Sequence, residues 1–281
     1  MRGTLARELA MLSVNTNSGA LSALRNLEAN HKWLETLQER IATGYKVGSV
    51  TDDAATYSIA QRMRGDLAGL NAAIGSIDRA TVAVDVAVVA TESISDILTE
   101  MKGKMASLVS ARENGDDSAA TAYTRDLDAY RDQIKTIISS ATFNGTNLID
   151  HSNGVISALA NSDGSDTIDF EHQDLSFGGA LITLTDDSDY SMAELENSIK
   201  NVNAAMSHFG TASRRLEIQK EFTNKLHNVI EEGIGRLVDA DLARTAADLQ
   251  AAQIKEQLGI TALSIANQAP RSLLTLFGLK S

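Results

Sequence analysis

Apolar residues recur every three or four positions between residues 20 and 41, as they do on one face of an α-helix. The same stretch fits a heptad repeat whose first position holds Ala20, Leu27, Leu34 and Ile41 and whose fourth position holds Ala23, Asn30 and Leu37. This seam predicts a helix that pairs with another helix in a coiled coil, with the polar Asn30 fixing the register. An ordinary amphipathic helix is the alternative, because three heptads make a short repeat.

A second apolar run, rich in Ala and Leu, extends from Leu237 to Phe277. Its two offset stripes consist of Leu242, Ala246, Leu249 and Ala252, and of Ile254, Leu258, Ala262, Ile265 and Ala269. Two stripes on one helix predict that it covers more than one neighbour. Charged residues on its other face, such as Asp248 and Lys255, exclude a membrane span.

Three further helices are expected in the middle of the chain. Residues 81–90 alternate like a strand, but their valines also continue a helical stripe that runs on to Leu108, and we predict a helix. Residues 113–118 form a turn, and amphipathic helices follow at 123–141 and 192–237. For the first of the three helices, the spacing of Ser49 and Asp52 is typical of a capping box at its start.

Residues 150–192 differ in composition, because Gly, Ser and Asp cluster there. The short runs 167–170 and 180–184 predict strands in a β-hairpin or small β cap. The acidic segments 163–166 and 186–189 lack the ligand order of a calcium-binding EF-hand, so we interpret them as solvated loops.

Composition narrows the function classes. The 281 residues include one Pro and no Cys, so long uninterrupted helices are permitted and disulfides are excluded. The formal net charge of −12 argues against nucleic acid as the main partner. No apolar core of a signal peptide stands at the N-terminus.

Motifs for catalysis or cofactor binding are missing from the sequence. The five His residues are scattered without metal-ligand spacing, and the sequence holds no Gly-x-Ser-x-Gly or Walker loop. We therefore expect no enzyme activity, no cofactor and no metal.

Several motifs resemble those of bacterial flagellin. The most specific is Ala266-Asn267-Gln268-Ala269-Pro270 before the pair Leu273-Leu274, preceded by the segment 239–243. Similar matches lie at residues 12–27, at 43–62, and at 142–149, where the chain resembles the flagellin turn that closes half of the core. The resemblance covers residues 11–149 and about 195–279.

The resemblance implies a mainly α fold in which long antiparallel helices form a rod built from both chain ends, with a small β region at the tip. Residues 11–48 and 237–281 would form a terminal coiled-coil domain of the inner filament tube. Residues 49–149 and 193–236 would form a helical core domain, and 150–192 a short variable insert. Residues 1–10 lie outside the family pattern and are expected to be absent from filaments.

The resemblance also implies that the chain is a structural subunit that polymerises into the flagellar filament for swimming, outside the cell. A flagellin-like hook–filament junction protein is the alternative. Export would proceed unfolded through the flagellar type III apparatus. The implied partners are other flagellin subunits, a filament cap, a junction protein and a cytoplasmic export chaperone. The residues expected at subunit interfaces are Leu21, Leu24, Leu27, Leu34, Leu37, Ile41, Leu249, Leu258, Leu263, Ile265, Asn267, Gln268, Leu273, Leu274 and Phe277.

Overall fold

The computed structural model describes residues 16–152, 155–184 and 190–276, and the side chains of this range up to Gln268. The chain divides into two compact units. The first, here called the terminal unit, consists of residues 1–62 and 232–281, and the second, the central unit, of residues 63–231.

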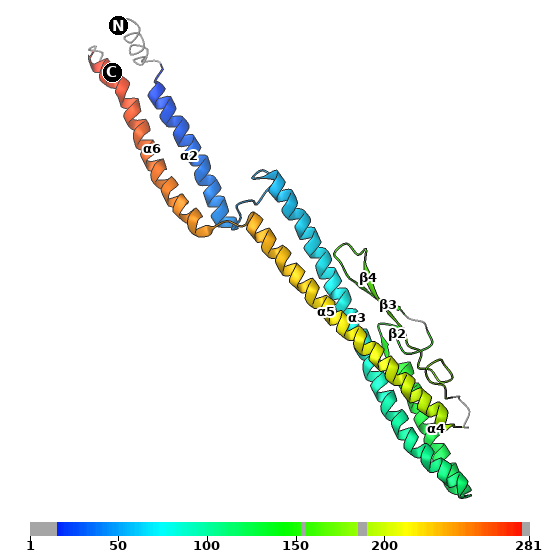
Figure 1. Cartoon of the computed structure of the whole chain (residues 1–281). Helices are drawn as coiled ribbons and strands as arrows, with labels where there is room; N and C mark the ends of the chain where they lie inside the picture. The colour runs from blue at the N-terminus through cyan, green and yellow to red at the C-terminus, as the bar shows by residue number, and fades with distance from the viewer. Residues whose placement is uncertain (1–15, 153–154, 185–189, 277–281) are drawn as a thin grey trace. The chain divides into compact units, whose positions relative to one another are not determined.

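Two helices dominate the terminal unit. Helix α2 (Ser18–Thr43) and helix α6 (Leu242–Leu276) lie side by side, although contacting residues such as Asn30 and Ala252 are 222 positions apart in the sequence (Figure 1). The side chain of Asn17 caps α2 by accepting a hydrogen bond from the N–H of Ala20 at 3.0 Å. The predicted pairing of the two apolar runs is therefore confirmed.

Helices α3 (Ala54–Glu113), α4 (Asp117–Ser140) and α5 (Met192–Val238) build the central unit, and α3 and α5 also reach into the terminal unit (Figure 1). Because α3 is continuous across residues 81–90, the prediction of helix for that stretch is confirmed. The largest fully buried side chains belong to this unit: Ile77, Ile94, Leu98, Met101, Met105, Leu108, Leu127, Ile134, Ile149, Leu175, Ile182 and Phe209. Burial of apolar surface in this core is the main force that holds the three helices together.

Three polar contacts define the register of α3 against α5. Lys220 pairs with Asp78 at 2.7 Å. Seventeen residues later on α3, Ser95 donates to Asn203, which lies seventeen residues earlier on α5. Lys102 and Glu196 continue the series seven residues further on, at 2.9 Å. The two helices are therefore antiparallel in one constant register.

A small hairpin follows α4. Strands β1 (Thr142–Phe143) and β2 (Thr146–Asn147) pair antiparallel around Asn144 and Gly145, whose positive φ angles of 49° and 80° suit a two-residue turn. The buried Asn147 side chain donates to the carbonyl oxygen of Ile138 at 2.6 Å and accepts from the N–H of Ile149 at 2.9 Å. The turn predicted at 142–149 is confirmed.

The predicted β region is only partly right. Strand β4 (Thr167–Glu171) matches the prediction, but it pairs with β3 (Val155–Leu159), a strand that the sequence pattern does not predict. The predicted strand at 180–184 is wrong. The N–H of Thr183 donates to the Ser198 hydroxyl at 3.1 Å instead of to a strand, while Ile182 and Leu184 are buried in the core. The segment contacts α5 through side-chain hydrogen bonds and forms only an isolated β-bridge, between Phe177 and Ile182, so its strand-like composition reflects burial.

The β3–β4 hairpin lies along α3 and α5 (Figure 1). The N–H of Leu159 donates to the hydroxyl of Ser76 on α3 at 3.2 Å. The amide of Gln219 on α5 donates to the carbonyl oxygen of Ala160 at 2.9 Å. The two contacts hold the end of β3 against both helices.

Replacing Gly69 with Ala should release this hairpin. A Cβ atom at position 69 of α3 would lie 2.0 Å from the backbone oxygen of Ser162, so the backbone has to move. We expect a loss of about 1–3 kcal/mol in the free energy of unfolding, as overpacked sites show. Urea unfolding measures this change. The matched control is Gly65→Ala on the same helix, where nothing lies within 4 Å. That variant should be up to about 1 kcal/mol more stable, and equal stability of the two variants would contradict the prediction.

Candidate assembly interface

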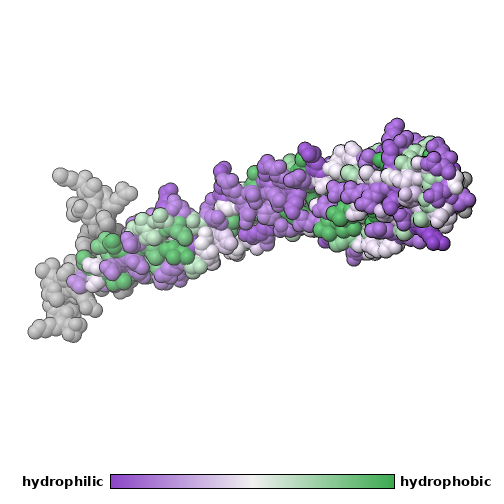
Figure 2. Space-filling model, turned by 90° about the horizontal axis from the view of Figure 1, so that it is seen from below, coloured by the Kyte–Doolittle hydropathy of each residue, from purple (hydrophilic) through white to green (hydrophobic). Residues whose placement is uncertain are grey.

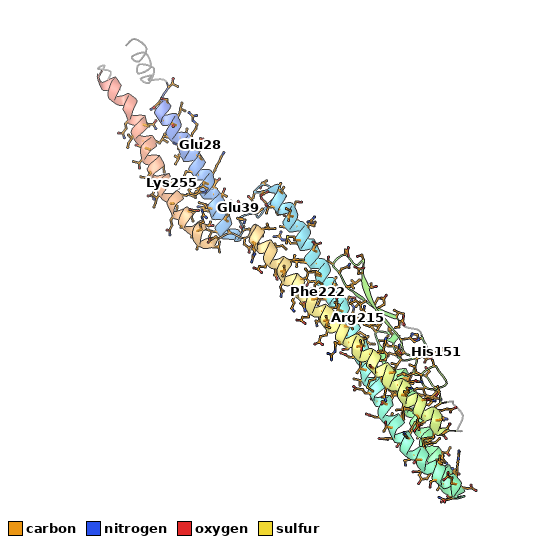
Figure 3. The ribbon with its side chains drawn as sticks, in the orientation of Figure 1. Glu28, Glu39, His151, Arg215, Phe222 and Lys255 are labelled. Atoms are coloured by element: carbon orange, nitrogen blue, oxygen red, sulfur yellow. The ribbon has the colours of Figure 1, made fainter. Side chains whose placement is uncertain are left out.

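The contact between α2 and α6 is built on few large side chains. Leu34, Leu37 and Ala252 are buried together, and Trp33 and Leu249 pack against them. The ammonium group of Lys255, labelled in Figure 3, lies 4.7 Å from the centre of the Trp33 ring, a cation–π contact. The centre of the predicted heptad seam on α2 therefore faces α6, whereas Ile41, at its end, is 38% exposed.

The residues of α6 that face α2 overlap only in part with the stripes expected from hydrophobicity: Leu249 and Ala252 of the first stripe face α2, whereas Leu242 and Ala246 are exposed. The buried or half-buried positions follow a heptad spacing of mostly small residues: Thr245, Ala252, Gly259 and Ala266, interleaved with Leu249, Glu256 and Leu263. A Cβ atom on Gly259 would stand 3.1 Å from Leu27, so the two helices approach closely there. The sequence signal for this face is the seven-residue repeat of small residues, which an apolar scan overlooks.

Two asparagine side chains of α2 and its cap bind the backbone of α6. Asn30 donates to the carbonyl oxygen of Ala252 at 2.9 Å, and Asn17 donates to that of Ala266 at 2.7 Å. These bonds form only in one alignment of the two helices. The role predicted for Asn30 in fixing the register thus has a specific partner.

A short connection after α2 is tied to the end of α5 within the terminal unit. The N–H of Lys46 donates to the carbonyl oxygen of Val238 at 2.8 Å, and the N–H of Ala240 donates to that of Gly44 at 2.8 Å. Tyr45 and Asp239 form an isolated antiparallel β-bridge. The connection therefore joins the chain before α3 to the chain before α6.

The carboxylate of Asp52 closes the next turn. It accepts hydrogen bonds from the N–H groups of Gly48 and Ser49 and from the Ser49 hydroxyl. The Ser49 N–H and hydroxyl, aided by the Gly48 N–H and the charge of Arg40, hold the pKa of Asp52 below its usual value. The turn is thus built around an ionised carboxylate.

The predicted helix start at Ser49 is wrong by several residues. Helix α3 begins at Ala54, and the carboxylate of Asp53 caps it by accepting from the N–H groups of Ala55 and Thr56. The hydroxyl and N–H of Thr56 also lower the pKa of Asp53. The carboxylate of Asp52 binds the N–H groups of the turn, so the carboxylate of Asp53 caps the helix instead.

The residues expected at subunit interfaces fall into three groups. Leu34 and Leu37 are buried against α6, and Leu27, Leu249 and Leu263 are half-buried in the same seam. Exposed side chains in the same subunit are Leu21, Leu24, Ile41, Leu258, Ile265, Asn267 and Gln268. The side chains of Leu273 and Leu274 on α6, and all of Phe277, lie outside the described residues.

One face of α6 is apolar and uncovered in the subunit. Ile254, Leu258 and Ile265 are 59%, 63% and 64% exposed. Leu21 and Leu24 on α2 are also exposed. In Figure 2, hydrophobic surface gathers on the part of the molecule next to the chain ends drawn in grey. Because exposed apolar patches of this kind mark interaction sites, we treat this face as the candidate interface.

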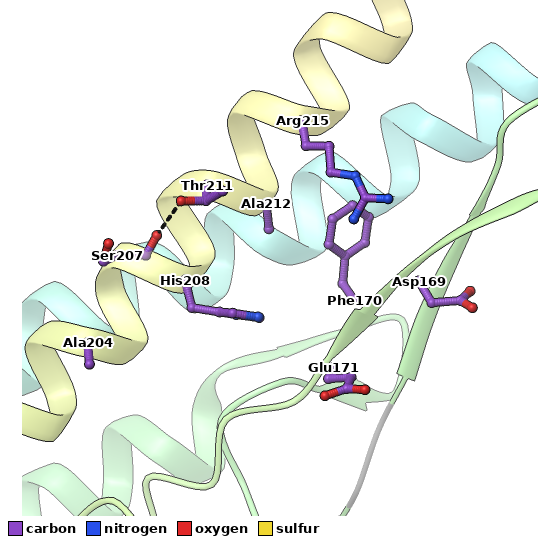
Figure 4. A pocket seen from close by; sticks show the side chains of 9 residues that line it. All are labelled: Asp169, Phe170, Glu171, Ala204, Ser207, His208, Thr211, Ala212 and Arg215. Atoms are coloured by element: carbon purple, nitrogen blue, oxygen red, sulfur yellow. Dashed lines mark hydrogen bonds between the residues drawn. The ribbon is translucent and has the colours of Figure 1, made fainter.

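A groove of about 440 Å³ lies between β4 and α5 (Figure 4). Arg215 lies beside the ring of Phe170, and Asp169 and Glu171 flank that ring on the strand. The Thr211 hydroxyl donates to the backbone oxygen of Ser207. The groove thus offers mixed charges on a regular helix and strand, without an activated nucleophile.

A second polar cluster pairs His151 with Asp174, with 2.9 Å between Nδ1 and Oδ2. The hydrogen bond to this carboxylate raises the pKa of His151. Burial opposes ionisation of Asp174, but hydrogen bonds from His151 and Ser176 lower its pKa overall. Within the described residues no three His, Asp or Glu side chains are grouped to hold a metal ion. No helix in that part of the chain has the apolar length that a membrane crossing requires.

Comparison with known proteins gives a consistent family assignment. Residues 14–154 match the family described as the bacterial flagellin N-terminal helical region, and residues 192–277 match the C-terminal helical region. The flagellin FljM of Caulobacter vibrioides is 37% identical over 275 residues, covering 96% of this chain and all of that protein. Flagellin C of Rhizobium meliloti and a flagellin of Brucella melitensis are each 30% identical, covering 95% of this chain and 99% of those proteins.

Proposed function

The chain belongs to the bacterial flagellin family, and we propose that the exposed apolar face of α6, together with the exposed leucines of α2, joins it to adjacent subunits. Flagellins are structural proteins rather than enzymes, and they polymerise into the flagellar filament outside the cell. The mainly helical fold with two small antiparallel strand pairs agrees with that assignment.

The observation that carries the proposal is the exposure of Ile254, Leu258 and Ile265 on a helix whose other side is already occupied by α2. Covering one such side chain completely contributes about 1.5–3 kcal/mol. A subunit that binds neighbours through this face gains that energy at every contact along the polymer. Leu21, Leu24, Ile41, Asn267 and Gln268 would line the same interfaces, and Leu273, Leu274 and Phe277 would extend them.

The buried residues of the seam serve the interface indirectly under this proposal. Leu27, Leu34, Leu37, Leu249 and Leu263 hold α2 against α6 and so fix the relative positions of the exposed side chains. Residues 11–48 with 237–281 would act as the inner-tube domain, 49–149 with 193–236 as the helical core domain, and 150–192 as an outward insert. Residues 1–10 would be absent from assembled filaments.

Family membership also supports a set of partners and a route. The subunit would leave the cytoplasm unfolded through the flagellar type III apparatus, after binding an export chaperone. It would add at the distal end of a growing filament beneath a cap, with a hook–filament junction protein at the base, and the filament would drive swimming. The absence of Cys is compatible with export of an unfolded chain.

Electron microscopy of purified protein added to filament seeds tests the proposal. Growth of tubes over micrometre lengths is the expected result. The alternative function, a hook–filament junction protein, predicts short rings that do not elongate. Seeds that fail to grow under conditions in which an established flagellin elongates would overturn the filament proposal.

A further inference from the structure

Resting on the proposed filament function, we infer a second, specific contact between two copies of the central unit. In this contact a stripe on α5 of one copy enters a groove between α3 and α4 of the next. The groove and the stripe are different surfaces of one subunit. When two copies join through different surfaces, the groove stays free at one end of the assembly and the stripe stays free at the other. Further copies can therefore add, and the contact propagates into a polymer.

The groove is apolar and open. It has a volume of about 470 Å³ and is lined on the α3 side by Val82, Val86 and Val89 and on the α4 side by Ile137. Val82 and Val89 are 44% and 62% exposed. β-Branched residues such as Val have a lower helix propensity than Ala or Leu, so exposed valines on a helix are unfavourable unless a contact covers them.

The stripe on α5 carries larger side chains. Ile218, Phe222 and Val229 are 62%, 56% and 66% exposed and share one helical face. Among the described residues of the central unit, Phe222 is the one exposed aromatic side chain (Figure 3). Aromatic anchors that insert into apolar pockets commonly dominate protein interfaces.

The charges beside the two surfaces are complementary. Exposed Asp85 and Asp96 stand beside the valines of α3, and exposed Arg214 and Lys225 stand beside the stripe of α5, where Lys225 also pairs with Glu221 at 2.6 Å. Each pair is eleven residues apart, close to three helical turns, so its members lie on one edge of their helix. Opposite charge at matched spacing supports a second copy of this chain as the occupant of the groove.

A single antiparallel register satisfies both the charges and the apolar side chains. When Asp85 stands opposite Lys225, Asp96 stands opposite Arg214. A shift of one residue from this alignment places Val89 opposite Phe222. Val82 then stands opposite Val229, because Val82 and Val89 are seven residues apart on α3, as Phe222 and Val229 are on α5. The charged edges also fall on the same side of the contact when two helices meet antiparallel.

This register differs from the one within a subunit. The three contacts between α3 and α5 of one chain place position 209 across from Val89. Phe222 lies thirteen residues beyond position 209, which is about 20 Å along a helix. The inferred contact is therefore out of reach within one chain, and it shifts the neighbouring copy by about 20 Å along the helix direction.

Cysteine cross-linking tests the register, because the chain has no Cys of its own. The variants V89C/F222C and V82C/V229C are assembled on seeds under reducing conditions and then oxidised. A disulfide requires Cα atoms within about 7 Å, so both variants should yield a ladder of covalently linked subunits. The recombined control V89C/V229C, displaced by seven residues or about 10 Å, should yield none.

Charge reversal provides an independent measurement. Asp85→Lys should slow seeded elongation roughly threefold to tenfold by placing a cation opposite Lys225. Adding Lys225→Glu should restore the rate. Filaments without ladders, or with equal ladders in the control, would overturn the inference, as would elongation that Asp85→Lys leaves unchanged. Failure of the wild-type chain to elongate would instead count against the proposed filament function.

Discussion

Replacing Leu258 and Ile265 with Asp should abolish filament elongation while leaving the monomer folded. Both residues are more than 60% exposed in the subunit, so little contact within the chain is lost. In a polymer that covers them, the double variant forfeits about 3–6 kcal/mol of apolar burial per subunit. It also adds the cost of burying two unpaired carboxylates.

The measurements are seeded elongation by electron microscopy and thermal unfolding of the monomer by circular dichroism. The matched control, Gln250→Asp with Gln257→Asp, adds the same charge at the same seven-residue spacing on another exposed face of α6. It should elongate far better than the double variant of the apolar face. Normal filaments from Leu258→Asp with Ile265→Asp would show that this face is not an interface.

A variant of the buried seam should behave differently. Leu37 is 2% exposed and packs with Leu34 and Ala252, so Leu37→Ala should loosen the α2–α6 pair itself by about 2–5 kcal/mol. Loss of assembly in that case would be accompanied by a lower melting temperature. The two variants therefore separate contacts within a subunit from contacts between subunits.

The helices were predictable because local pattern and tertiary structure agree. A chain with one Pro leaves long periodic segments unbroken, and residues 54–113 form a single helix despite the strand-like valines at 82–88. Burial of Val84 and Ala87 on one face outweighs the small helix penalty of β-branched residues.

The β region was harder because its partners are set by distant contacts. Residues 180–184 read as a strand, yet Ser198 and Glu194 of α5 receive the hydrogen bonds of Thr183. Strand β3 has only a partly alternating burial pattern, so the sequence gives a weak signal for it. The hydrophobic periodicity of the sequence does not predict hydrogen bonds between such distant residues.

The interface was predicted in outline but not in detail. Hydrophobicity identified α6 as a helix with two faces, but it could not tell which face the subunit itself covers. The structure places Ala252 and Gly259 against α2 and leaves Ile254 and Leu258 uncovered. Small residues on the face toward α2 let the two helix backbones approach closely. Because such residues have low hydrophobicity, a search for large apolar side chains gives this face a weak signal.

Deleting residues 270–281 should also abolish filament growth, with little effect on the rest of the subunit. The segment contains the apolar residues Leu273, Leu274, Leu276, Phe277 and Leu279. Burying five such side chains against neighbours would contribute on the order of 10 kcal/mol per subunit before the cost of ordering the chain. That cost is about 1–2 kcal/mol per backbone residue, so the segment needs neighbouring subunits to become stable.

The truncated monomer should keep its fold because the described contacts between α2 and α6 end before the deletion. Among the described residues, the last hydrogen bond of the pair is accepted by the carbonyl oxygen of Ala266. Circular dichroism and thermal unfolding of the remaining chain should match those of the full-length protein, while seeded polymerisation fails. A full-length variant with Leu273→Gln and Leu274→Gln separates apolar contact from length and should elongate poorly as well. Normal filaments from the truncated chain would show that assembly depends on other surfaces, because the largest apolar contribution assigned to the end of α6 would then be dispensable.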